Sequence, residues 1–114
     1  MATSLNNFVS EAQLGTSAAD LEVSSSSEKK FIGAATVTNT SASNVEVTLW
    51  LLATTSTETS GSGGNWFYRK TIPAGRTERI DAIIGQVIDQ SMTLSGSAGT
   101  AGVVNVNISG TTET

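Results

Sequence analysis

The chain has 114 residues, 38% of them hydrophobic and 14% charged, and its ten acidic and six basic side chains give a formal net charge of −4. This length predicts one domain with a modest core, and the mild charge argues against a nucleic-acid or anionic-membrane surface. The absence of cysteine and histidine excludes disulfides, thiol nucleophiles, imidazole metal ligands and a Ser-His-Asp triad.

Residues 1–18 show neither the basic nor the apolar region of a secretory leader, so we expect the protein to start in a cytoplasm. We interpret this segment as an N-terminal arm, with either a short helical turn around residues 5–14 or a weak strand at 11–14. Because such a segment is ill-suited to fold alone, we expect it to contact a partner. The longest apolar run, residues 49–53, is too short to span a bilayer.

Strand signals begin weakly at residues 18–24 and become clear at residues 29–39. In the second stretch Phe31, Ala35 and Val37 share one parity. Side chains of one parity lie on one face of a strand. We therefore expect these three residues to face the core together.

A polar turn at residues 40–44 separates this strand from another at 45–53. Ser and Asn side chains in the turn offer local hydrogen bonds that compete with strand pairing. The first half of 45–53 alternates between apolar and polar residues, and its second half is apolar on both faces. Two strands around a short turn predict a hairpin of 29–39 with 45–53.

The Ser/Thr/Gly-rich tract at residues 54–65 predicts a long loop. Strand patterns and turn residues then continue to the end of the chain. The expected elements are an aromatic strand at 66–72, a turn at 73–75 in which Gly75 can take a positive φ, a return strand at 76–82, a bend at Gly85 within the ambiguous segment 83–88, and a final pair at 92–98 and 103–109 joined by 99–102.

Seven or eight short strands at this spacing predict an all-β fold, a small antiparallel β-sandwich or jelly-roll-like domain. We place this domain at residues 19–110. The arm, 1–18, precedes it, and a C-terminal tail, 111–114, follows it. Like the arm, the tail is expected to be a contact element.

Catalytic motifs are weak in this chain. Ser26-x-x-Lys29 and Ser27-x-x-Lys30 match a serine/lysine dyad, but such matches arise by chance in a Ser-rich chain. The glycines at 61, 63 and 64 lack the lysine and the strand–helix context of a phosphate-binding loop, and no segment has the acidic pattern of a calcium loop. We therefore expect no enzyme activity, no cofactor and no metal site.

Aromatic and basic side chains concentrate between residues 66 and 79. The rings can supply core volume, but because Trp66 and Tyr68 alternate with Phe67, some ring must point outward as an interface anchor or a sugar platform. The basic residues there, like Lys29 and Lys30, are either solvated strand ends or a patch for an acidic partner. The candidate protein-contact residues are Trp66, Tyr68, Arg69, Lys70, Arg76 and Arg79.

Three stretches together resemble the small β-sandwich structural proteins of tailed bacteriophages. They are a strand that ends in Asn39-Thr40-Ser41, the turn Ile72-Pro73-Ala74-Gly75-Arg76-Thr77, and a closing strand within Ala98 to Gly110. The likeness covers residues 30 to 110, and its motifs describe turns and strand parity. Members of the group often have Gly-Asp where this chain has Gln90-Ser91, so the turn before the last strand pair is expected to differ.

The resemblance implies a virion protein made in the host bacterial cytoplasm, foremost a capsid decoration (cement) protein that stabilises the head. A neck, collar or tail-associated subunit and a tail-tip receptor- or carbohydrate-binding module are the alternatives. The implied partners are the major capsid protein or other virion proteins, with further copies of the chain in a dimer or trimer. Neither nucleic acid nor a membrane is an expected partner.

Overall fold

The computed structural model describes residues 3–52 and 66–114, and within them the chain forms nine strands and no helix. The strands are β1 (Thr3–Gln13), β2 (Ala19–Val23), β3 (Lys29–Asn39), β4 (Val45–Leu52), β5 (Tyr68–Ile72), β6 (Thr77–Arg79), β7 (Val87–Ile88), β8 (Thr93–Ala98) and β9 (Val104–Glu113). The loop expected at 54–65 and the end of the strand expected at 45–53 lie outside the described residues.

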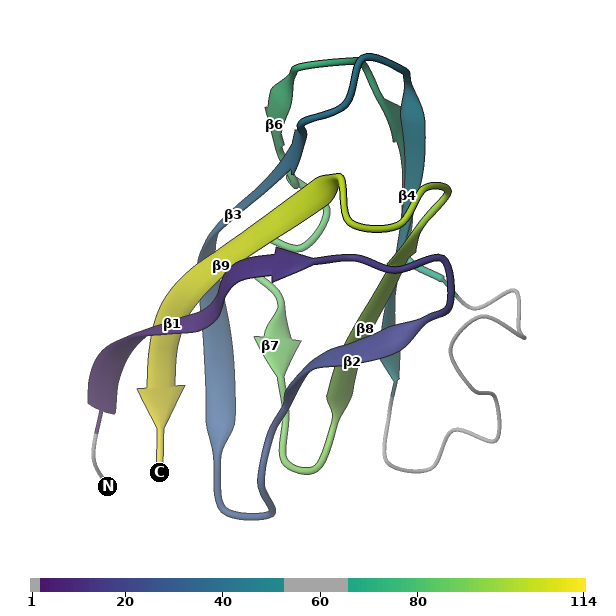
Figure 1. Ribbon diagram of the computed structural model, residues 1–114. Helices are drawn as coiled ribbons and strands as arrows, with labels where there is room; N and C mark the ends of the chain where they lie inside the picture. The colour runs from purple at the N-terminus through teal and green to yellow at the C-terminus, as the bar shows by residue number, and fades with distance from the viewer. Residues whose placement is uncertain (1–2, 53–65) are drawn as a thin grey trace.

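Two antiparallel sheets pack against each other as the layers of a sandwich (Figure 1). Sheet A has the order β1-β9-β3-β6, with the short β7 also paired to β3, and sheet B has the order β2-β8-β4-β5. The strand orders of the two sheets match. The strand at each position of sheet A is adjacent in the sequence to the strand at the same position of sheet B, which gives the pairs β1 and β2, β9 and β8, β3 and β4, and β6 and β5. This is the eight-stranded jelly roll with β7 added. It confirms the expected all-β sandwich.

The hairpins expected from the sequence are wrong. The members of each expected pair, β3 with β4, β5 with β6 and β8 with β9, lie in different sheets. The turn after β3 shows the reason, because the buried Asn39 donates from Nδ2 to the carbonyl oxygens of Ser43 (2.7 Å) and Ile72 (2.9 Å). These bonds direct the chain across to the other layer instead of back along β3.

A β-bulge in β3 reverses the face to which Phe31 points. The pairing of β3 with β9 shifts between Ile32 and Ala34, and the alternation restarts after that shift. Ile32, Ala35 and Val37 are buried, whereas Phe31 is 50% exposed. The expectation that Phe31 shares the face of Ala35 and Val37 is therefore wrong, because a bulge inserts one residue into the period of two.

The core lies between the inner faces of the two sheets. In sheet A, many of the buried apolar side chains come from β3 and β9, and in sheet B many come from β4. The largest of the fully buried side chains are Ile32, Val37, Val47, Leu49, Ile72, Ile80, Ile83, Ile88, Leu94, Val104, Val106 and Ile108. Burial of this apolar area is the main favourable contribution to folding in a chain without disulfides.

The boundary expected after residue 18 falls between β1 and β2, and the boundary expected after residue 110 falls within β9. β1 occupies most of residues 1–18 as a strand rather than a helical turn, pairs with β9, and is followed by the buried Leu14. β9 continues through the expected tail to Glu113. Residues 3–7 carry little apolar signal, so their place in the sheet follows from backbone hydrogen bonding to a distant strand.

Two expected bends are confirmed by the backbone. Gly75 has a φ of 69° in the turn between β5 and β6, and Gly85 has a φ of 91° in the turn before β7. Both angles lie in the left-handed region that favours glycine. Within residues 3–52 and 66–114 there is no helix long and apolar enough to cross a membrane.

Candidate protein-contact surface

The basic residues predicted as contacts lie along the edge strands β5 and β6, and acidic neighbours pair with most of them. Arg69 Nε is 3.8 Å from Glu46, and Lys70 Nζ is 2.7 Å from Glu78. The Lys70–Glu78 pair joins the edge of sheet B to the edge of sheet A, and its hydrogen bond raises the pKa of Lys70.

Arg79 Nε lies 2.6 Å from Asp81, so it too has an acidic partner. Of the four basic residues predicted here, Arg76 alone has no acidic partner in the part of the chain that the structure describes. Ion pairing therefore neutralises most of this region.

The two predicted aromatic contacts have different surroundings. Tyr68 is buried among the core residues, which contradicts its expected exposure, and desolvation raises the pKa of its hydroxyl. Trp66 is 38% exposed, and the Arg69 guanidinium lies 4.5 Å from the centroid of its ring. This cation–π contact covers one face of the indole. That face is therefore not available to a sugar or a partner.

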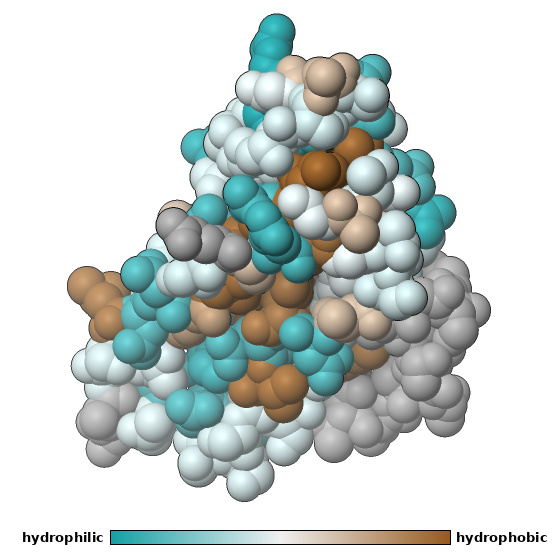
Figure 2. Space-filling view, viewed as in Figure 1, coloured by the Kyte–Doolittle hydropathy of each residue, from teal (hydrophilic) through white to brown (hydrophobic). Residues whose placement is uncertain are grey.

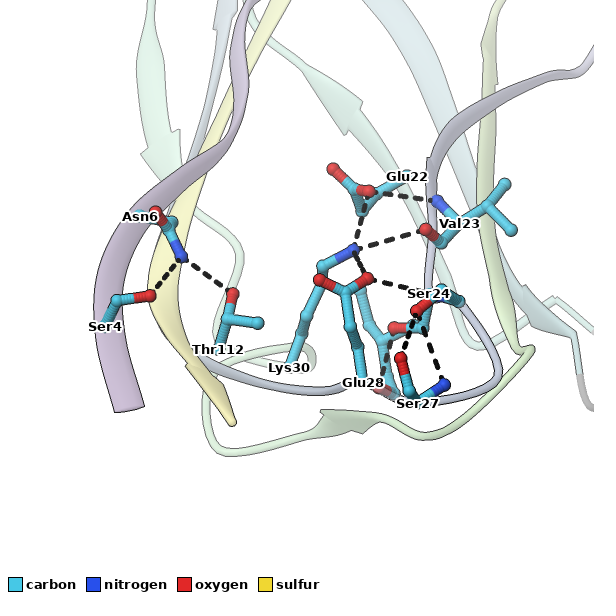
Figure 3. Close-up of polar contacts among 11 residues, drawn as sticks. Ser4, Asn6, Glu22, Val23, Ser24, Ser27, Glu28, Lys30 and Thr112 are labelled. Carbon is cyan, nitrogen blue, oxygen red and sulfur yellow. Dashed lines mark hydrogen bonds and ion pairs between the residues drawn. The ribbon is translucent and has the colours of Figure 1, made fainter. Parts of the chain in front are cut away.

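Lys30 is not the solvated strand end that the sequence allowed. Its ammonium group points from β3 toward β2, where it lies 2.9 Å from Glu22 and 3.5 Å from Glu28 and donates to the Val23 carbonyl (Figure 3). The Lys30 side chain is only 8% exposed. The face of the molecule drawn in Figure 2 has apolar side chains in its middle and hydrophilic ones beside them. The ion cluster thus ties the two sheets together.

A row of exposed apolar side chains crosses the outer face of sheet A. Leu5 on β1 pairs in register with Thr111 on β9, Thr111 with Phe31 on β3, and Phe31 with Val87 on β7. Leu5 is 86% exposed, Phe31 50% and Val87 42%. We call these four residues the sheet A row. Because three large apolar side chains lie on one line of neighbouring strands, they form a patch rather than scattered exposures.

The surface around the sheet A row is polar. One shallow hollow, toward β7, is lined by Lys29, Phe31, Val87, Thr111 and Glu113. A second, toward β1, is lined by Leu5, Asn6, Asn7, Phe31, Gly33, Ser109, Gly110 and Thr111. Lys29 pairs in register with Glu113, and its Nζ lies 4.0 Å from Asp89. An apolar centre with a polar border is typical of protein–protein contact surfaces.

Sequence reasoning did not find this surface. The parity of residues 29–39 predicts that Phe31 faces the core, and no sequence pattern marks Leu5 or Val87 as a contact. The available signal was Gly33, because an isolated glycine within a strand suggests a bulge. A bulge at Gly33 would have separated the faces of Phe31 and Val37.

Among the described residues no cluster of acidic side chains is arranged to hold a metal ion. Comparisons of the chain with protein-family models, with curated proteins and with solved structures found no match.

Proposed function

We propose that the chain is a non-catalytic structural protein of a tailed-bacteriophage virion, a capsid decoration protein that binds the major capsid protein through the outer face of sheet A. The observation that carries this proposal is the sheet A row, Leu5, Thr111, Phe31 and Val87, with its polar border. An exposed apolar patch of this kind favours burial against another protein.

Two further features support this proposal. The first is the resemblance of the strand end at residues 39–41, the turn at 72–77 and the closing strand within 98–110 to small phage structural proteins. The second is the jelly roll itself, an architecture that viral capsid proteins use, although lectins and cupins use it as well. The architecture is compatible with the proposal, and the sheet A row is the surface that favours contact with another protein.

A tail-tip receptor- or carbohydrate-binding module is the second candidate, and Trp66 favours it. The indole is partly exposed, and an exposed aromatic ring is a surface on which a sugar ring can stack. A neck, collar or tail-associated subunit would use the sheet A row in the same way as a decoration protein. Position on the particle and the effect on adsorption therefore distinguish the candidates.

The proposal is tested on gradient-purified particles of the phage that carries the gene. We expect the chain to sediment with the particles, and we expect immunogold labelling on the head. Labelling at the neck or tail would favour the alternative location. A Trp66→Ala phage that assembles but no longer adsorbs would favour the receptor-binding candidate. Absence of the chain from the particles would overturn the proposal.

The sheet A row is tested by binding purified chain to particles from a phage that lacks the gene. Phe31→Lys is expected to weaken binding at least tenfold, because it places a charge in the centre of the apolar patch. The matched control is Ala101→Lys, which adds the same charge at an exposed position in the turn before β9, at the far end of that strand. Equal affinities for the two variants would remove the sheet A row from the contact.

A further inference from the structure

The strands at the edges of the two sheets differ in how they are protected from pairing with another strand. β6 and β7 have only three and two residues, and β2 and β5 have five each, with charged side chains in both. Short length and charge both discourage pairing with another chain. β1 is the exception, since it has 11 residues, and its first five, Thr3–Asn7, include neither a charge nor a proline.

The segment Thr3–Asn7 also differs from the rest of its own strand. It pairs with β9 at five consecutive residues, whereas shifts in register interrupt the pairing after Asn7 and after Val9. All five of its residues are exposed, although they point alternately to both faces of the sheet. Val9, by contrast, is only 4% exposed. The first half of β1 is therefore a regular edge with little burial of its own.

We propose that Thr3–Asn7 is a self-association edge, which pairs antiparallel with the same segment of a second copy and extends sheet A across the dimer. An edge strand presents free N–H and C=O groups that an added strand can satisfy. A two-fold axis at Leu5 places Leu5 opposite Leu5 of the second copy, Ser4 opposite Asn6, and Thr3 opposite Asn7.

The chemistry of this register favours a second copy as the occupant. Antiparallel pairing about a two-fold axis repeats every contact, so any charge at its centre would meet a like charge. Thr3–Asn7 contains no charged side chain. At its centre an apolar side chain meets its own copy, and hydroxyl groups meet amides on either side. The two sheet A rows then join into one that crosses both copies.

The interface is small, since a five-residue strand pair buries well under the ~1,200 Å² of a stable complex. We therefore expect a weak dimer, with a dissociation constant on the order of micromolar or higher. The inference rests on the proposed function in that both treat the protein as an assembly unit. It is tested with purified chain alone, so its outcome is independent of particle binding.

Sedimentation equilibrium of three samples tests the register. Leu5→Lys and Leu5→Glu are each expected to raise the dissociation constant of the homodimer at least tenfold, because like charges then face each other. A mixture of the two variants is expected to recover association as a heterodimer, because the charges are then opposite. Hydrogen exchange of the unmodified chain should show protection of Thr3–Asn7 that increases with protein concentration.

Phe31→Lys is the control, because Phe31 lies in the sheet A row but not at the edge of the sheet. We expect this variant to dimerise as the unmodified chain does. Loss of association in Phe31→Lys but not in Leu5→Lys would show that the outer faces stack, and it would overturn edge pairing. A chain that is monomeric at millimolar concentration, or a mixture that fails to associate, would also overturn it. Particle binding with a monomeric chain would leave the proposed function standing.

Discussion

At the scale of single residues, Gly110 allows β9 to approach the bulge of β3. A Cβ at Gly110 would collide with the carbonyl oxygen of Phe31. We expect Gly110→Ala to lower the free energy of unfolding by about 2–4 kcal/mol, because either the backbone or the bulge must shift. Chemical denaturation measures the loss. The matched control is Gly33→Ala, whose Cβ would lie 3.9 Å from its nearest neighbour, Gly110 Cα; equal losses for the two variants would contradict the collision.

The carboxylate of Glu28 gives stability a dependence on pH. A hydrogen bond from the Ser25 backbone N–H and then the charge of Lys30 hold the pKa of Glu28 below its ordinary value of 4.5. A carboxyl group whose pKa is lower in the folded state stabilises the fold above the unfolded pKa and loses that contribution as pH falls through the folded pKa. We therefore expect stability to decline as pH falls below about 4.5.

The variant Glu28→Gln isolates this contribution of Glu28. Its denaturation midpoint is expected to be lower than that of the unmodified chain at pH 7, and the difference between the two is expected to shrink as pH falls below 4.5. Asp89→Gln is the control, because Asp89 is exposed and its pair with Lys29 is long, at 4.0 Å. A difference between Glu28→Gln and the unmodified chain that is the same at pH 7 and pH 3 would contradict the argument.

At the scale of elements, the side chain of Asn39 stabilises the turn through which the chain passes from β3 in sheet A to β4 in sheet B. Besides its two donated bonds, its Oδ1 accepts hydrogen bonds from the N–H (3.0 Å) and the hydroxyl (2.8 Å) of Ser41, and the side chain is fully buried. The amide therefore satisfies polar groups of the turn itself and of the end of β5. The turn between β3 and β4 is thus stabilised by one side chain that has both donors and acceptors.

Replacement of Asn39 by Ala is expected to lower the free energy of unfolding by about 2–4 kcal/mol, because the buried Ile72 carbonyl oxygen then loses the hydrogen bond from the amide. Asn39→Asp should be no better, since a carboxylate cannot donate to the two carbonyl oxygens. Asn44→Ala in the same turn is the control, because Asn44 is exposed and its Oδ1 accepts a single bond of 3.2 Å from the Ala74 N–H. Thermal unfolding of the three variants provides the comparison, and similar losses for Asn39→Ala and Asn44→Ala would refute the assignment.

At the scale of the whole molecule, the extended stretches were predictable, but their partners were not. The strand predicted at 29–39 has those limits in the structure, and the bends at Gly75 and Gly85 occur where glycine predicted them. The three expected strand pairs, the hairpin of 29–39 with 45–53 among them, are all replaced by turns that cross from one sheet to the other. Alternation shows which side chains share a face. It is the same in two strands that form a hairpin within one sheet and in two strands joined by a turn that crosses to the other sheet. Sequence patterns alone therefore cannot separate them.

The candidate surface was predicted less well than the fold. Trp66 is partly exposed as predicted, but Tyr68 is buried and most of the basic residues near it are paired. The sequence does not predict the sheet A row, because its members are residues 5, 31, 87 and 111, which no local sequence pattern connects. One bulge in β3 and the pairing of Thr3 with Glu113 bring them into line.

By itself, the sequence determined that the chain is all-β, where most of its strands run, and where it turns, because alternation, proline and glycine act on the backbone over a few residues. Only the tertiary structure decided which strands pair, which of the two sheets each one joins, and which apolar side chains remain outside. Those outcomes depend on contacts between residues up to 110 positions apart, such as Thr3 with Glu113. They also depend on buried polar groups, such as Asn39 and Lys30, whose partners come from distant segments.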